Sequence, residues 1–154
     1  MHCIIAATDG SESADRAVDF AADLAAKFDA RLILMHVVAG TTLSAKPNSL
    51  AHPQVELRAR ARLETTSIAE VVTEAAENLL DRVRYRAAVR GARHIESEVR
   101  AGAAAEAIIA VAEERQADGI VLGRRGHGRL ARLLLGSVSE KVAAHASCPL
   151  ILVP

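Results

Sequence analysis

Aromatic residues are almost absent from this sequence, which has no tryptophan, one tyrosine and two phenylalanines in 154 residues. Hydrophobic residues nevertheless make up 51% of the chain. The core must therefore be built from alanine, valine, leucine and isoleucine, and small side chains of this kind suit helices packed closely on a parallel sheet. A chain of this length fits one domain and can bury a full core.

The sequence also lacks a net charge, a cysteine framework and a long apolar run. Its 19 basic and 19 acidic side chains cancel, which argues against nucleic-acid binding driven by phosphate neutralisation. Neither a run of 18 apolar residues nor a charged-then-apolar N-terminus occurs, so we expect no membrane span and no signal peptide. Only two cysteines are present, Cys3 and Cys148, and both are expected to be small buried thiols. Together these features predict a cytoplasmic protein.

Short apolar runs alternate with segments of helical spacing along most of the chain. Such runs are typical of strands covered on both faces, and their alternation with helices predicts a parallel sheet. The predicted fold class is α/β, with residues 1–154 forming a single domain, an open five-stranded sheet with helices on both faces. The predicted strands are 3–7, 30–38, 94–99, 120–122 and 150–153, and the predicted helices are 14–27, 54–89, 103–116 and 137–146.

Serines mark two predicted helix starts. Ser11 or Ser13 is expected to cap the first helix. Ser67 and Glu70 form a capping-box pattern, so the sequence predicts a new helix start at Ser67 within the long segment 54–89. Residues 40–53, which are rich in small polar residues, glycine and proline, are predicted to form a loop.

A glycine-rich segment follows the predicted strand 120–122. Gly123 and Gly126 are followed, after nine intervening residues, by Gly136 and Ser137. A strand, a glycine-rich loop and a helix start in this order aim backbone N–H groups at an anion, most often a phosphate. The segment matches neither G-x-x-x-x-G-K-[ST] nor G-x-G-x-x-G. The alternative interpretation is a simple connection between strand and helix.

Polar and cationic side chains surround these glycines. Ser137 and Ser139 are expected to offer hydroxyl donors, and one of them is expected to cap the helix, since a cap and a phosphate contact use the same geometry. Surface arginines are usually only solvated, but several cationic side chains lie within this short segment. Arg125 and Arg129, the latter beside Gly128, are the ones we expect to face phosphate.

The spacing of Gly123, Gly126, Gly136 and Ser137 resembles the ATP-binding signature of the universal stress protein family. Almost the whole chain is similar to that family, except about residues 40–65, where the family itself is variable. The resemblance implies the sheet order 3-2-1-4-5 and a site for ATP, or for AMP or ADP, with Mg²⁺ carried by the nucleotide. The local pattern and the resemblance together predict these binding residues: Ala7, Thr8, Asp9, Val37, Leu122, Gly123, Arg125, Gly126, Gly128, Arg129, Gly136, Ser137, Val138 and Ser139.

Asp9 has two candidate roles. The local sequence Asp-Gly-Ser is an Asx-turn or N-cap pattern, whereas the resemblance implies that Asp9 contacts the adenosine. By the same resemblance, Val37 would offer backbone groups and apolar surface to adenine. His36 is expected to be a packed or hydrogen-bonded strand residue, because no second ligand stands at a metal-site spacing from it. No metal site is predicted.

The sequence shows no catalytic constellation. We therefore expect an ATP-binding regulatory protein of the stress response that hydrolyses its nucleotide slowly or not at all. One alternative is a nucleotide-hydrolysing or adenylyl-transferring enzyme on a related α/β fold. Its phosphate motif would follow the first strand, where this chain has an acidic turn poor in glycine. Another is a dimerising paralogue without nucleotide binding, against which the complete glycine set argues.

The segment 149–154 predicts a homodimer. It is apolar and uncharged, and as the last strand of a 3-2-1-4-5 sheet it would expose an unpaired edge. Antiparallel pairing of two such edges across a two-fold axis would satisfy the free N–H and C=O groups. The resemblance implies the same contact. No nucleic-acid or membrane partner is expected, and the downstream protein partner is left open.

Overall fold

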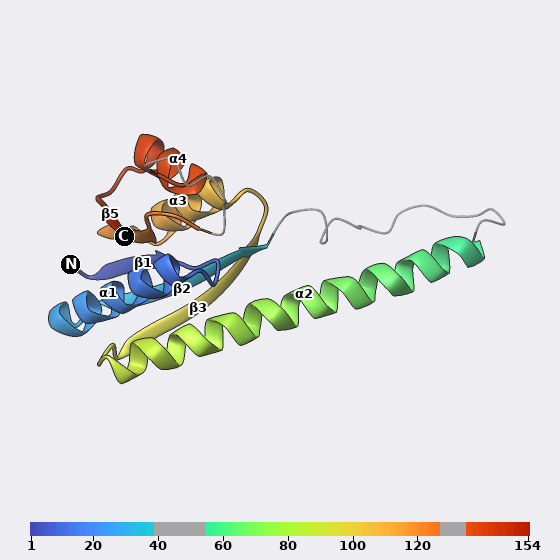
Figure 1. Ribbon diagram of the computed structural model, residues 1–154, viewed down its shortest axis with the longest axis horizontal. Coiled ribbons are helices and arrows are strands. Elements are labelled where there is room, and N and C mark those ends of the chain that lie inside the picture. The colour runs from blue at the N-terminus through green and yellow to red at the C-terminus, as the bar shows by residue number, and fades with distance from the viewer. Residues whose placement is uncertain (39–54, 127–134) are drawn as a thin grey trace.

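The computed structural model describes residues 1–38, 55–126 and 135–154, which form one sheet with helices on both faces (Figure 1). Within these residues, none of the helices is both long and apolar enough to cross a membrane. The elements in chain order are β1 (Cys3–Ala7), α1 (Glu12–Phe28), β2 (Arg31–Val38), α2 (Val55–Val89), β3 (His94–Ala101), α3 (Ala104–Glu114), β4 (Gly119–Gly123), α4 (Ser137–His145) and β5 (Leu150–Val153).

All neighbouring strands are parallel, and their order is β3-β2-β1-β4-β5. The central strand β1 pairs with β2 on one side and with β4 on the other, so that Ile5 lies opposite both Ile33 and Ile120. The chain first builds the sheet outward from β1 to β3, then crosses back to build β4 and β5. This arrangement confirms the predicted fold class and strand order.

Different helices cover the two faces of the sheet (Figure 1). Ile4 and Ala6 of β1 pack on the side of α1 and α2, whereas Cys3 and Ile5 pack on the side of α3 and α4. Because successive strand residues point to opposite faces, a fully apolar strand supplies both cores at once. The buried face of α1 consists of small residues that bring the helix close to the sheet: Ala14, Ala17, Val18, Ala21, Ala22 and Ala25.

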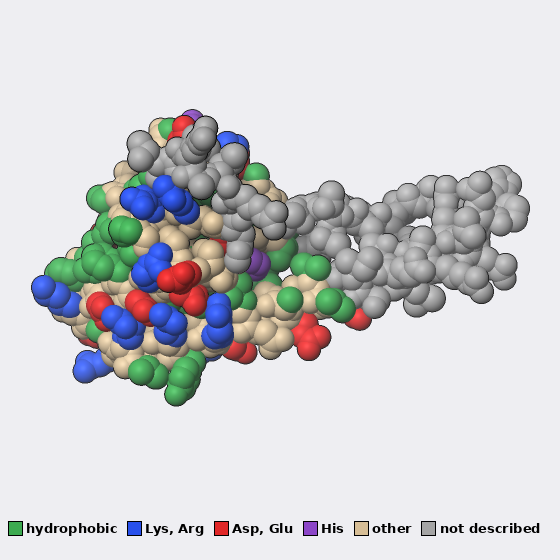
Figure 2. Space-filling model, in the orientation of Figure 1, with side chains coloured by type: hydrophobic (Ala, Val, Ile, Leu, Met, Phe, Trp, Pro, Cys, Tyr) green, Lys and Arg blue, Asp and Glu red, His purple; other side chains and the backbone are tan. Residues whose placement is uncertain are grey.

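A ladder of ion pairs joins α1 to α2, and Figure 2 shows basic and acidic side chains gathered over these helices. In its middle rung the Arg86 guanidinium donates two hydrogen bonds to the Asp19 carboxylate, at 2.5 and 2.7 Å. The hydrogen bond from Arg86 lowers the pKa of Asp19 from its ordinary value. Repetition every four residues on both helices fixes their register. The rungs are Asp15–Arg82, Asp19–Arg86 and Asp23–Arg90.

The helix α2 runs without a break from Val55 to Val89, so the predicted helix start at Ser67 is wrong. A capping box acts only where the preceding residues leave the helix, and here good helix formers such as Leu63 and Glu64 continue it. One end of α2 extends well past the sheet (Figure 1). The predicted loop 40–53 lies outside the described residues.

Candidate functional site

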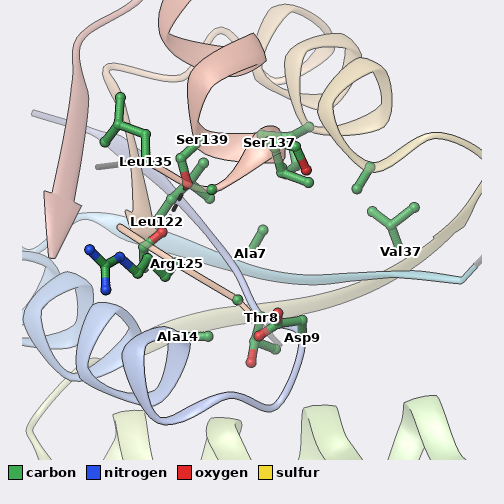
Figure 3. A pocket seen from close by; sticks show the side chains of 16 residues that line it. Ala7, Thr8, Asp9, Ala14, Val37, Leu122, Arg125, Leu135, Ser137 and Ser139 are labelled. Carbon is green, nitrogen blue, oxygen red and sulfur yellow. Dashed lines mark hydrogen bonds between the residues drawn. The ribbon is translucent and has the colours of Figure 1, made fainter. Parts of the chain in front are cut away.

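A pocket of about 310 Å³ opens at the carboxyl ends of β1, β2 and β4 (Figure 3). The strand order reverses at this point, because β1 lies between β2 and β4. In open parallel sheets, ligands bind in the crevice at such a point. The first turns of α3 and α4 form further walls of the pocket. The topology therefore places one cavity where a parallel sheet most often holds its ligand.

The turn from β1 into α1 lines the pocket and is closed by its own hydrogen bonds. The Asp9 carboxylate accepts from the N–H of Ser11 at 3.0 Å, and the Thr8 hydroxyl accepts from the N–H of Gly10 at 3.1 Å. Gly10 has a φ of 82°, where a side chain is disfavoured. The Ser11 hydroxyl caps α1 by accepting from the N–H of Ala14. Asp9 thus forms the Asx-turn that the local sequence predicts, and it also lines the pocket.

Contacts to β2 hold the end of β1 in place. The N–H of Thr8 donates to the Met35 carbonyl at 2.9 Å, and Nδ1 of His36 lies 2.7 Å from the Thr8 carbonyl. His36 is therefore a hydrogen-bonded strand residue, as predicted. The next residue, Val37, lines the pocket with its side chain (Figure 3).

Gly123 lies against the first turn of α1, and Gly126 lies against Asp9 in the turn before that helix. A Cβ on Gly123 would lie 2.6 Å from Ser13 Oγ and 2.7 Å from the Ser13 carbonyl carbon. A Cβ on Gly126 would collide with the Asp9 carboxylate. The atoms closest to Gly123 include backbone atoms of Ser13 and Ala14, which cannot move without shifting α1. The atoms closest to Gly126 belong to the Asp9 side chain, which can rotate. The fold itself therefore requires glycine at position 123.

The helix α4 begins at the pocket on a glycine. Gly136 is the N-cap residue and provides no side-chain hydrogen bond. The first helical bond runs from the N–H of Glu140 to the Gly136 carbonyl, so the N–H groups of Ser137, Val138 and Ser139 have no helical acceptor. Three backbone donors at the positive end of a helix suit an anion.

Neither predicted serine caps α4, which corrects that expectation. Ser139 is buried, and its hydroxyl donates to the Gly123 carbonyl at 2.9 Å. Ser137 is exposed at the first helical position and lines the pocket. The tertiary contact with the loop takes the Ser139 hydroxyl, because β4 ends directly beside the first turn of α4. The Ser139 side chain thus braces the glycine loop.

The rest of the pocket wall is mainly apolar. Val37 and Leu122 were predicted to line it, but Ala104 and Ile108 were not. These two residues lie one turn apart on α3, and only the helical spacing after the third strand could have indicated them. Ala14 and Leu135 also line the pocket and were also missed. Apolar side chains facing a helix N-terminus suit a ligand that has a flat apolar part and an anionic part.

The pocket gathers most residues of the predicted site, although their contact with a ligand stays a prediction. Arg125 is exposed, and its guanidinium points away from Ser137 and Val37 (Figure 3). Gly128 and Arg129 lie outside the described residues. In the described part of the chain, no group of three His, Cys, Asp or Glu side chains is placed to hold a metal ion. The predicted residues that line the pocket are Ala7, Thr8, Asp9, Val37, Leu122, Gly123, Arg125, Gly126, Gly136, Ser137, Val138 and Ser139.

Comparison with known proteins identifies relatives over the whole chain. The universal stress protein MJ0531 of Methanocaldococcus jannaschii is 34% identical over 150 residues, covering 97% of this chain and 80% of that protein. The universal stress protein UspA from Lactobacillus plantarum has a similar structure, with a TM-score of 0.79 and 21% identity over 99% of this chain and 97% of that one.

A further solved structure is a universal stress protein in complex with cAMP. It has a TM-score of 0.67 and is 28% identical, and the likeness covers 99% of this chain and 95% of that one. The model of the universal stress protein family matches residues 1–154. The chain therefore belongs to the universal stress protein family.

Proposed function

We propose that this protein is a nucleotide-binding regulatory domain of the stress response, with ATP as its ligand and Mg²⁺ carried by the nucleotide. The observation that supports this most strongly is the N-terminus of α4, whose three N–H groups have no helical acceptor and lie at one pocket with Asp9 and an apolar wall. A phosphate chain needs donors, a base needs apolar surface, and a ribose needs an acceptor. The proposal takes the chain 1–154 as one cytoplasmic domain.

Each part of the pocket would contact a different part of the nucleotide. The N–H groups of residues 137–139 and the close approach of the loop at Gly126 would hold the phosphates. Val37 and Ile108 would pack against the base, and Asp9 would accept a hydrogen bond from the ribose or the base. Arg125, Gly128 and Arg129 stay proposed contributors to phosphate binding. The proposal includes at most slow hydrolysis.

A cyclic nucleotide is a second candidate ligand. One structure similar to this chain is a universal stress protein in complex with cAMP. The cyclic phosphate has one anionic group, which the N–H groups at the start of α4 could bind without the rest of the loop. ATP would therefore need contacts with both the start of α4 and the glycine loop, whereas cAMP would need only those with the start of α4.

The test begins with protein purified under native conditions, which is then denatured so that any released nucleotide can be identified. Calorimetry on protein stripped of nucleotide then compares Mg-ATP, AMP and cAMP. We expect Mg-ATP to bind at least as tightly as AMP. Tighter binding of cAMP would favour the second candidate, and no heat from any of the three near millimolar ligand would contradict nucleotide binding altogether.

We also propose a homodimer through residues 149–154. The strand β5 lies at one edge of the sheet, and all four of its residues are only half-buried. Leu150 and Leu152 face the side of α3 and α4, whereas Ile151 and Val153 face the side of α1. Pairing of two β5 edges would therefore extend both cores across the interface and cover an edge that carries no charge.

Light scattering should give about twice the 16.3 kDa of one chain. Leu152→Asp should produce monomer or insoluble protein, because it places a charge on the paired edge. Val99→Asp is the matched control, since Val99 lies on β3 at the opposite edge of the sheet and is 36% exposed. A wild-type monomer at high micromolar concentration would contradict the dimer.

A further inference from the structure

The hydroxyl of Ser13 lies behind the pocket, at a junction of three segments. Ser13 belongs to the first turn of α1, and its Oγ donates to the carbonyl of Val153 at 3.2 Å. The N–H of Arg125 donates to the same oxygen in a long hydrogen bond, at 3.5 Å. A hydroxyl can donate one hydrogen bond while it accepts others. Ser13 can therefore join the last strand to the glycine loop at once.

The Ser13 hydroxyl lies close against Gly123. The side chain lies so close to Gly123 that a Cβ there would be 2.6 Å from Oγ. The Val153 carbonyl also accepts from the N–H of Arg124 at 2.7 Å, and the Arg124 carbonyl accepts from the N–H of Gly136 at 2.9 Å. The start of the loop is thus tied to β5 on one side and to the N-cap of α4 on the other.

These contacts fix the direction of the loop where it passes the pocket. The peptide of Arg125 is turned toward Ser13, and Gly126 follows it at the pocket beside Asp9. Ser13 itself does not line the pocket. A residue in this position can change ligand binding only through the loop that it supports.

We propose that Ser13 is a positioning residue that holds the start of the glycine loop, residues 124–126, against β5 in the orientation that binds phosphate. The inference rests on the proposed nucleotide function, which it extends by assigning a role to a side chain outside the pocket. It implies that loss of the hydroxyl weakens the part of binding that depends on phosphate and leaves the nucleoside part unchanged.

Ser11 provides a control on the same helix. Ser11 caps α1 through the N–H of Ala14, whereas Ser13 makes its contacts with β5 and the loop. Ser11→Ala therefore weakens the start of α1 without removing a contact to the loop. Ser13→Ala removes the contacts to the loop and to β5 and keeps the cap.

The experiment measures Mg-ATP and adenosine affinity by calorimetry for the wild type, Ser13→Ala and Ser11→Ala, together with hydrogen exchange at the Arg125 amide in nucleotide-free protein. We expect Ser13→Ala to bind Mg-ATP about two- to tenfold more weakly, as the loss of one or two hydrogen bonds would cause. Its adenosine affinity should be unchanged and its Arg125 amide should exchange faster. Ser11→Ala should leave all three quantities at wild-type values.

The outcomes separate the two proposals. If the wild type binds no nucleotide, the proposed function fails and the positioning role fails with it. If the wild type binds Mg-ATP and Ser13→Ala binds it equally well, only the positioning role is overturned. Equal loss of ATP and adenosine affinity in Ser13→Ala would make Ser13 a general structural residue and would also overturn the inference.

Discussion

Two strand-to-helix turns lie side by side at the carboxyl edge of this sheet. Side chains accept hydrogen bonds from the backbone N–H groups of one turn, whereas the helix that follows the other turn has no side-chain cap. The turn from β1 into α1 satisfies its donors internally, since Asp9, Thr8 and Ser11 each accept from a nearby N–H. The turn from β4 into α4 has a glycine at the N-cap and no side-chain cap. Its serine at position 139 instead donates to the loop.

The backbone donors of the first turn therefore contribute to stability, whereas those of the second turn are the candidates for binding a ligand. A closed turn stabilises the helix that follows it, whereas an open turn keeps donors available at some cost to the helix. Both turns line the same pocket, so the first would supply an acceptor and the second would supply donors.

Substitution of Gly136 should abolish nucleotide binding and leave the fold intact. An added Cβ there would lie at ordinary contact distances, 3.5 Å from the Arg124 carbonyl oxygen and 3.7 Å from the Gly126 nitrogen, and the φ of −73° suits any residue. Gly136→Val would therefore fill space that the ligand needs and not space that the fold needs. Several charge-assisted hydrogen bonds would be lost, so we expect Mg-ATP affinity to fall at least about a hundredfold in calorimetry.

A circular dichroism spectrum that shows folded protein serves as the control for Gly136→Val. Wild-type affinity in a folded variant would show that α4 does not bind the phosphates.

Replacement of Asp9 should weaken ATP and AMP by a similar factor, because the proposed contact is with the adenosine that both share. Loss of a charged hydrogen-bond partner costs about 1.5–3 kcal/mol, or about ten- to a hundredfold in affinity. Competition binding with both nucleotides measures the effect of Asp9→Ala. Asp23→Ala, on the exposed side of α1, is the control. Unchanged affinity for both nucleotides would contradict the proposed contact between Asp9 and the adenosine.

Gly123→Ala should destabilise the protein, in contrast to substitution at Gly136. Its Cβ would lie 2.6–2.8 Å from atoms of Ser13 and Ala14, including backbone atoms of α1. Overpacking of this kind costs about 1–3 kcal/mol in the free energy of unfolding, which urea denaturation measures. A free energy of unfolding equal to that of the wild type would mean that α1 can move away from residue 123 without destabilising the protein.

Ser11→Ala should have the smallest effect. It removes the cap of α1 and should lower the free energy of unfolding by about 1 kcal/mol. Because Ser11 does not line the pocket, and because its N–H, which donates to Asp9, is kept in alanine, nucleotide affinity measured in the same preparation should not change. A loss of affinity without a loss of stability would contradict the division between the two turns.

Local pattern was enough to predict much of the fold. Apolar runs such as 3–7 and 150–153 became β1 and β5 with the expected bounds. The same reasoning failed at Ser67, where a capping pattern competes with a long helical segment and the segment continues. The strand order came from the family resemblance, because spacing along the chain does not say which strands are neighbours.

The sequence predicted which segments form the candidate site, but not the contacts that their residues make. Glycine spacing indicated the loop, yet it could not distinguish Gly123, which the fold requires, from Gly136, which it does not. Nor could it assign the Ser139 hydroxyl to the Gly123 carbonyl, or bring Ile108 of α3 into the pocket. Each of these depends on which distant segment lies beside the residue.

The sequence by itself determined the elements, the closed turn around Asp9 and the glycine-rich loop, because each rests on residues within a few positions of one another. The tertiary structure decided that the Ser139 hydroxyl donates to Gly123, which glycine is indispensable, and that Ser13 joins the loop to β5. The two residues of that last contact, Ser13 and Val153, are far apart in sequence, and only the parallel packing of β4 and β5 beside α1 brings them within 3.2 Å.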